Sequence, residues 1–241
     1  MTTVKLPIQV LCLAACLAAA PARAECPVPG TDAAAHFETC RNLAETGDPV
    51  AQRQLGTLYQ RGAGVVPSDE LALRWYRKAA AQGDAVALYN LGVMYDAGHG
   101  VEQDHAAAAH WYRQAADKGD AKAIYNLGLL HEYGLGMAQD YGEAMRLYRQ
   151  AAELGEPWAQ FALALLYDKG LGVERDPVRA YMWFDIVGEA HEHALHNRDS
   201  VAEELTAAQI EEAQGLAREW RAKVTSRWLE INVRVQRHKV A

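Results

Sequence analysis

Apolar and small residues recur along this chain in one 36-residue pattern that is repeated four times without interruption. Counted from the first glycine of each copy, position 5 is always Ala, position 9 is always Leu and position 12 is Leu or Met. Spacings of four and three residues place these positions on one face of a helix. Each copy is therefore expected to begin with an amphipathic helix, helix A, whose buried stripe in the first copy is Ala51, Leu55 and Leu58.

The second half of each copy predicts another helix, helix B. Glycines at positions 16 and 18 are suited to ending helix A, and Ser or Asp at position 22 is a favourable N-cap for helix B. Large residues at positions 29 and 30 alternate with small ones at positions 26 and 33, as in interdigitating antiparallel helices. A glycine at position 10 of three copies (Gly56, Gly92 and Gly128) implies close approach to a neighbouring helix. Each copy is thus expected to form a helical hairpin.

Tandem hairpins of this period predict an all-α fold, a right-handed α/α solenoid, because one hairpin is too small to bury its apolar face and must stack on its neighbours. The four copies are 47–82, 83–118, 119–154 and 155–190. A leader with a helix around 32–45, within 25–46, is expected to cap one end. A degenerate fifth unit, 191–223, is expected to cap the other.

The fifth unit predicts two helices. Residues 191–205 form one, and Thr206 with Gln209 makes a capping box for the next, which is expected to end near Lys223. The remaining segment, 224–241, is a basic tail in which Arg and Lys outnumber the single Glu230. Two interpretations of the tail stay open: a flexible end, or a segment that docks on the acidic body.

The pattern GDA-x-A-x-YNLG-x-x-Y-x-x-G-x-G-V-x-x-D-x-x-x-A-x-x-WYR-x-AA resembles the Sel1-like repeat family, a branch of the tetratricopeptide-type solenoids. The resemblance covers residues 47–190. It implies a scaffold or adaptor role in protein–protein interaction, often at the bacterial envelope. The stretch LTAAQIEEAQGLAREW resembles the C-terminal capping helix that is common in such proteins.

The N-terminus is expected to be a secretory signal peptide, residues 1–24. A weakly positive start is followed by an apolar run over about 8–20 and by the triplet ARA, which favours cleavage after Ala24. The run is shorter than the ~20 residues that a transmembrane helix needs. The chain is therefore expected to be periplasmic or secreted.

A lipoprotein signal is the competing interpretation, because the sequence LAAC at 13–16 matches the pattern in which Cys16 becomes lipidated. This interpretation predicts an outer-membrane lipoprotein. In either case Cys26 and Cys40 remain, and a pair of cysteines in an exported chain predicts a disulfide between them.

Charge and motif content exclude several functions. The net charge of −7 and the absence of a long basic run argue against nucleic acid as a partner. No catalytic residues, metal ligands or cofactor are expected, since no nucleophile motif appears. His191, His193 and His196 lack the spacing of a zinc-protease helix, so they are interpreted as solvated residues of a capping helix.

The candidate site is a surface. Positions 4, 7 and 11 of helix A point away from the buried stripe and become less polar along the stack. In solenoids of this type helix A lines the concave wall, so these positions predict an apolar binding groove. An alternative is that neighbouring helices A bury much of the strip. The candidate groove residues are Arg53, Tyr89, Asn90, Tyr125, Asn126, Leu129, Trp158, Phe161 and Leu165.

The preferred hypothesis is a non-enzymatic, exported scaffold that binds a protein or peptide in this groove. A β-lactam-binding or hydrolysing enzyme is an alternative implied by the exported branch of the family, although those relatives are rich in cysteines and these repeats contain none. A third hypothesis is a structural or glycan-binding envelope protein, in which Tyr89 with Asn90, or Tyr125 with Asn126, contacts the sugar.

Overall fold

The computed structural model describes residues 26, 32–188, 191 and 193–240, with side chains as far as Ser226, and all regular structure in this part of the chain is helical. The expected signal peptide, its cleavage after Ala24 and the alternative lipid anchor at Cys16 lie outside the described residues. The helices are α1 (Ala33–Glu45), α2 (Pro49–Arg61), α3 (Asp69–Ala81), α4 (Ala85–Ala97), α5 (His105–Ala116), α6 (Ala121–Tyr133), α7 (Tyr141–Glu153), α8 (Pro157–Lys169), α9 (Pro177–Val187), α10 (Ala194–Ala202) and α11 (Ala207–Val240).

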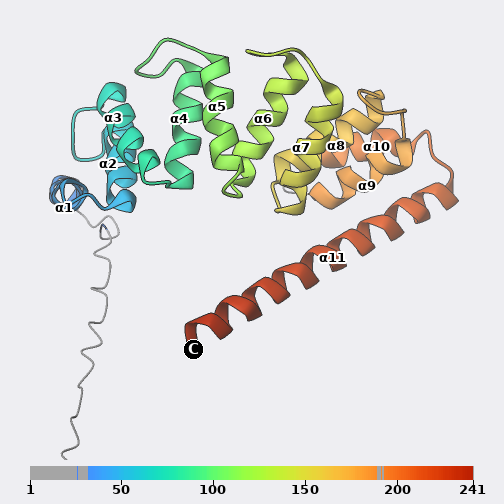
Figure 1. The fold of residues 1–241 in the computed structure, drawn as a ribbon. Coiled ribbons are helices and arrows are strands. Elements are labelled where there is room, and N and C mark those ends of the chain that lie inside the picture. Colours follow the sequence, from blue (N-terminus) through green and yellow to red (C-terminus); the bar gives the residue numbers. More distant parts are fainter. Residues whose placement is uncertain (1–25, 27–31, 189–190, 192, 241) are drawn as a thin grey trace, which may run out of the picture.

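The helices form a row of antiparallel hairpins (Figure 1). Helices α2, α4, α6 and α8 are the four helices A, and each packs most extensively on the helix B that follows it, α3, α5, α7 and α9 respectively. Each hairpin then packs on the next through its helix B. The predicted all-α solenoid is therefore confirmed. Of the helices in the described part, none combines the length and apolar character that a membrane span requires.

Short polar side chains begin the helices, and glycines end helices A. Helices B start at Ser68, Asp104, Asp140 and Asp176, as predicted, and each of these side chains accepts a backbone N–H of the first turn. Helices A are capped in the same way by the acidic residue at position 2, Asp48, Asp84, Asp120 or Glu156. Gly62 ends α2 in the left-handed region, with φ of 67°, which non-glycine residues rarely adopt.

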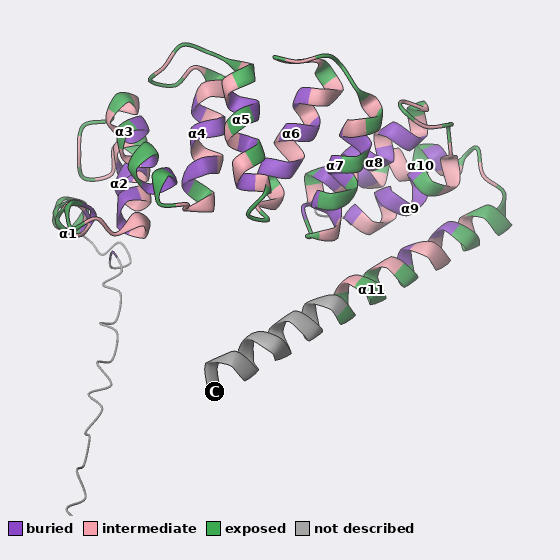
Figure 2. Ribbon diagram, viewed as in Figure 1, coloured by how far each residue is buried: buried purple, intermediate pink, exposed green. Residues whose placement is uncertain are grey.

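The core follows the predicted stripe of helix A (Figure 2). Leu55, Leu91 and Leu163 are completely buried, as are the alanines at position 26 of every helix B. The glycine at position 10 leaves room for the tyrosine ring at position 30 of the same hairpin. A Cβ on Gly128, for example, would lie 2.5 Å from Cε1 of Tyr148. The expected close approach is thus made by an aromatic side chain of helix B.

The N-terminal end is closed by α1. Cys26 and Cys40 form the predicted disulfide, with Cα atoms 5.1 Å apart. Cys40 is fully buried in a small apolar cluster with Phe37, Leu55 and neighbouring residues of α1 and α2. The Phe37 and Tyr59 rings meet edge to face at 5.3 Å. The leader therefore completes the first hairpin's core, which is separate from the larger core of the later repeats.

The C-terminal end differs from the sequence-based prediction in two respects. The helix expected over 191–205 is shorter, since α10 spans only Ala194–Ala202. The capping box of Thr206 and Gln209 does begin α11, but that helix continues past Lys223 to Val240. No glycine or proline follows Gly215, so the chain contains no residue that would end the helix at Lys223.

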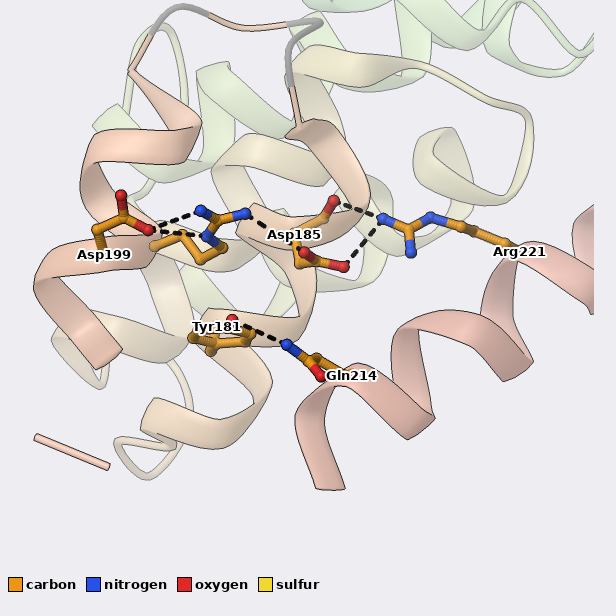
Figure 3. Close-up of polar contacts among 6 residues, drawn as sticks. Tyr181, Asp185, Asp199, Gln214 and Arg221 are labelled. Atoms are coloured by element: carbon orange, nitrogen blue, oxygen red, sulfur yellow. Dashed lines mark hydrogen bonds and ion pairs between the residues drawn. The ribbon is translucent and has the colours of Figure 1, made fainter. Parts of the chain in front are cut away.

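An aspartate in place of an arginine at one repeat position forms ion pairs with the last two helices. Position 31 is Arg in the first three repeats and Asp185 in the fourth. Asp185 accepts hydrogen bonds from Arg221 of α11, at 3.0 Å to Oδ2, and lies 3.6 Å from Nη1 of Arg198 of α10 (Figure 3). The Trp183 and Trp220 rings meet at 4.7 Å beside this contact. The basic segment of α11 beyond residue 226 has no described side chains.

Candidate binding site

The helix A wall is built on a floor of aromatic rings. Position 7 of helix A packs on position 30 of helix B within each hairpin from the second repeat onward. The ring centroids are 6.0 Å apart for Tyr89 and Tyr112, and 5.6 Å apart for Tyr125 and Tyr148. Tyr112 and Tyr148 are buried, whereas Tyr89 and Tyr125 are only half-buried. The strip is therefore partly buried by its own hairpins and partly accessible.

A pocket of about 420 Å³ opens on this wall between α4, α6 and α8. Trp158 forms one side and is 55% exposed, an unusual position for so large an apolar side chain. The lining residues are Tyr89, Lys122, Tyr125, Asn126, Glu156 and Trp158. Three successive repeats thus contribute to one concavity.

The tyrosines of the pocket are neutral hydrogen-bonding groups. Burial is the main cause that raises the pKa of Tyr125, to about 12, and Glu132 adds to it. Burial also raises the pKa of Tyr89, with a further contribution from Asp120. The Asn126 side chain beside the Tyr89 hydroxyl lowers the pKa of Tyr89 and opposes that rise. Both phenols therefore keep their protons at neutral pH.

Opposite charges lie at two sides of the pocket. Lys122 is exposed in the first turn of α6. Glu156 is 8% exposed and caps α8, because its Oε1 accepts the backbone N–H of Trp158 at 3.3 Å. The other helices A have the shorter Asp at this position. The pocket can accordingly offer an aromatic wall, amide and hydroxyl hydrogen bonds, an exposed ammonium group and a carboxylate that caps a helix.

The sequence-predicted groove residues divide into two groups. Tyr89, Tyr125, Asn126 and Trp158 line the pocket. Those that do not line it are Arg53, Asn90, Leu129, Phe161 and Leu165. Arg53 is held by Asp84, the N-cap of α4, with Nε 3.2 Å from Oδ1. Glu156 was not predicted, and its only sequence signal is a Glu where the earlier repeats have a capping Asp.

His191 corrects the interpretation of the histidine cluster. It is 8% exposed rather than solvated, and its ring stacks on Phe161 at 3.8 Å and meets Trp158 edge-on at 4.5 Å. The segment after α9 therefore covers the wall at Phe161, beyond the pocket. His193 and His196 differ from it in being less buried. Among the residues that the structure describes, no group of three acidic, His or Cys side chains is arranged to hold a metal ion.

The stacked hairpins define a helical-repeat protein. Comparison with known families identifies the type of repeat. A model of the Sel1 repeat matches residues 49–84, 85–120, 121–156 and 159–186. The chain belongs to the Sel1 repeat family, as its sequence pattern predicts. Proteins built from these repeats generally act as scaffolds for protein–protein interaction.

Two solved structures illustrate the similarity. A Sel1 repeat protein from Oxalobacter formigenes is 38% identical, with a TM-score of 0.61, over 67% of this chain and 68% of that chain. The second is c5321, a protective antigen present in uropathogenic Escherichia coli strains that displays an SLR fold. It is 30% identical, with a TM-score of 0.53, over 82% of this chain and 50% of its own, so the match spans half of the c5321 chain. Comparison with curated proteins gives no match.

Proposed function

We propose that this chain is a non-enzymatic scaffold of the bacterial cell envelope that binds a protein or peptide partner on the helix A wall. The observation that carries the proposal is the pocket in which Tyr89, Tyr125 and Trp158 converge from three successive helices A. Aromatic residues in a concave site contribute a large share of the binding energy in protein interfaces. Because packing fixes α4, α6 and α8 relative to one another, binding orders few groups of the scaffold and loses little entropy.

The chemistry of the pocket favours an extended segment that carries an apolar side chain next to an acidic one. The apolar side chain packs against Trp158 and the tyrosine rings. The Asn126 amide and the neutral tyrosine hydroxyls are suited to hydrogen bonds with the segment's backbone. Lys122 is available to pair with a carboxylate, whereas Glu156 repels one at the other side. This asymmetry sets the direction in which the segment lies.

The disulfide supports an exported location. Disulfides such as Cys26–Cys40 persist in oxidising compartments and are rare where thiols are kept reduced. The expected signal peptide leads to the same compartment. Together they favour the periplasm or the exterior as the place where the partner is met.

Site-specific photo-crosslinking in the native host tests the location of the binding surface. A photoreactive residue is placed at Val86, an exposed residue at position 4 of α4 on the helix A wall, and in a separate control variant at Gln150, on the exposed face of α7. We expect a discrete crosslinked partner from position 86 and none from position 150. Equal crosslinking from both positions would contradict a helix A site.

Affinity measurements with the captured partner test the chemistry. Trp158→Ala and Lys122→Glu are each expected to weaken binding by at least about tenfold, because they remove the exposed aromatic anchor or reverse the pocket's cation. Trp75→Ala is the matched control, since Trp75 lies on α3 beneath the Lys78 ammonium, 3.8 Å from its ring centroid. If Trp75→Ala weakens binding as much as Trp158→Ala does, the pocket is not the site.

A further inference from the structure

A second pocket lies next to the C-terminal helix. It has a volume of about 310 Å³ and is bounded by α7, α8, α9 and α11. Two tryptophans form its apolar part, Trp183 of α9 and Trp220 of α11, whose rings meet at 4.7 Å with an interplanar angle of 68°. The lining residues are Arg149, Tyr167, Arg179, Met182, Trp183 and Trp220. None of them lines the pocket on the helix A wall.

Two guanidinium groups converge on Tyr167 in this pocket. Arg149 donates a hydrogen bond from Nη2 to the Tyr167 hydroxyl at 3.2 Å. The Arg179 guanidinium carbon lies 5.7 Å from the Tyr167 ring centroid. Arg179 also pairs with Asp176, at 3.3 Å, but that carboxylate is the N-cap of α9 and also accepts the backbone N–H of Arg179. The lining of the pocket therefore includes two cations and no carboxylate of its own among the described residues.

The repeats themselves show that this arrangement is particular to the C-terminal end. The same positions in the first and second repeats hold Arg77 and Tyr95, with an Nη2 to hydroxyl distance of 2.6 Å. There the residue equivalent to Arg179 is Ala107, and α11 packs on α9 rather than on that hairpin. The arginine–tyrosine pair thus occurs in both places, whereas the second arginine and the Trp220 wall are present beside α11 and absent from the equivalent earlier site.

We propose that this pocket binds the C-terminal residue of a peptide, with its carboxylate between Arg149 and Arg179 and its apolar side chain against Met182, Trp183 and Trp220. Planar guanidinium groups recognise carboxylates through paired N–H donors. The volume lies at the low end of the range for small-ligand pockets and suits one large residue. Trp, Tyr, Arg and Met are also the residue types that are enriched in interface cores. This pocket shares no lining residue with the pocket on the helix A wall, so the present proposal is independent of the function proposed for that wall.

Ligand-observed NMR on the full chain tests the proposal with a matched pair of probes, N-acetylphenylalanine and its uncharged amide. We expect saturable binding of the acid and at least about tenfold weaker binding of the amide, since only the acid can pair with the arginines. Arg149→Gln and Arg179→Gln are each expected to weaken binding of the acid to a similar extent. Arg77→Gln, which removes the equivalent arginine of the first repeat, is expected to leave it unchanged.

Several outcomes overturn the proposal. They are equal affinity for acid and amide, the same loss from Arg77→Gln as from Arg149→Gln, or no saturable binding of the acid up to about 10 mM. A third probe, 3-phenylpropionate, tests the peptide assignment. If it binds as tightly as N-acetylphenylalanine, the pocket recognises a small carboxylic acid and not a peptide end. Binding at the helix A wall can be measured separately with the Trp158→Ala variant, so the two proposals fail independently.

Discussion

The solenoid is closed at its N-terminal end by a disulfide and apolar packing, and at its C-terminal end by apolar packing together with ion pairs around one aspartate. At the first end Cys26–Cys40 and Phe37 complete an apolar cluster with α2. At the other end Asp185 receives Arg198 and Arg221 from the last two helices. Both ends must cover a hairpin face that has no further repeat to stack on. The disulfide is independent of ionic conditions, whereas the ion pairs of Asp185 are screened by salt.

Removing the disulfide is expected to have the largest effect on stability. Cys26→Ala/Cys40→Ala opens a loop with a sequence separation of 14 residues and leaves a cavity beside Phe37, which on a chain-entropy estimate costs about 3 kcal/mol. The loss is local, because repeat proteins are stabilised by contacts between neighbours. Hydrogen exchange should show faster opening of α1 and α2 with α8 to α10 unchanged. Uniform loss along the whole stack would contradict separate ends.

Reversing the charge at the other end should have a somewhat smaller effect. Asp185→Arg restores the residue of the earlier repeats, removes the acceptor of Arg221 and Arg198, and adds a third cation. These pairs are partly exposed, so we expect a loss of about 1–2 kcal/mol from the contacts of α10 and α11. Hydrogen exchange in those helices provides the measurement, and Asp185→Asn is the milder control. Unchanged exchange rates would show that the apolar packing of Ala213, Ala217 and Trp220 holds α11 without these ion pairs.

The smallest effect is expected at the exposed pair of Arg175 and Glu204, which lie 2.8 Å apart between Nη1 and Oε2. The hydrogen bond from Arg175 lowers the pKa of Glu204. A carboxylate with a lowered folded-state pKa adds stability above its unfolded pKa, and that stability is lost as the pH falls through the folded value. An NMR titration of the Glu204 carboxyl should therefore give a higher midpoint in Arg175→Gln. Identical midpoints would exclude the pair in solution.

The two ends also differ in how far they can be predicted from sequence. Cysteine pairing and the helix of 32–45 are local signals, and both are confirmed. Asp185 is visible only as a departure from three arginines, and its partners lie 13 and 36 residues further along the chain. No local pattern links such distant residues. The extent of α11 was also mispredicted, since the helix continues to Val240, through the segment that was expected to be a separate basic tail.

The candidate site could also be predicted only in part, because the sequence pattern reveals the repeat period but not contacts between distant segments. The repeat period places Tyr89, Tyr125 and Trp158 on one wall, so these residues can be grouped from the sequence alone. The period does not reveal which of them another element covers. Phe161 has the same position 7 as Tyr125, yet His191 stacks on it, and that contact comes from a segment outside the repeats. Arg53 likewise pairs with the cap of the next helix A.

We propose the wall of α4, α6 and α8 as the binding surface. Hydrogen exchange of the chain with and without its crosslink-identified partner tests it most directly. We expect slower exchange in the first turns of α6 and α8 and around Tyr89 in α4, with α3, α5 and α7 unchanged. Protection confined to helices B, or to α11, would contradict it.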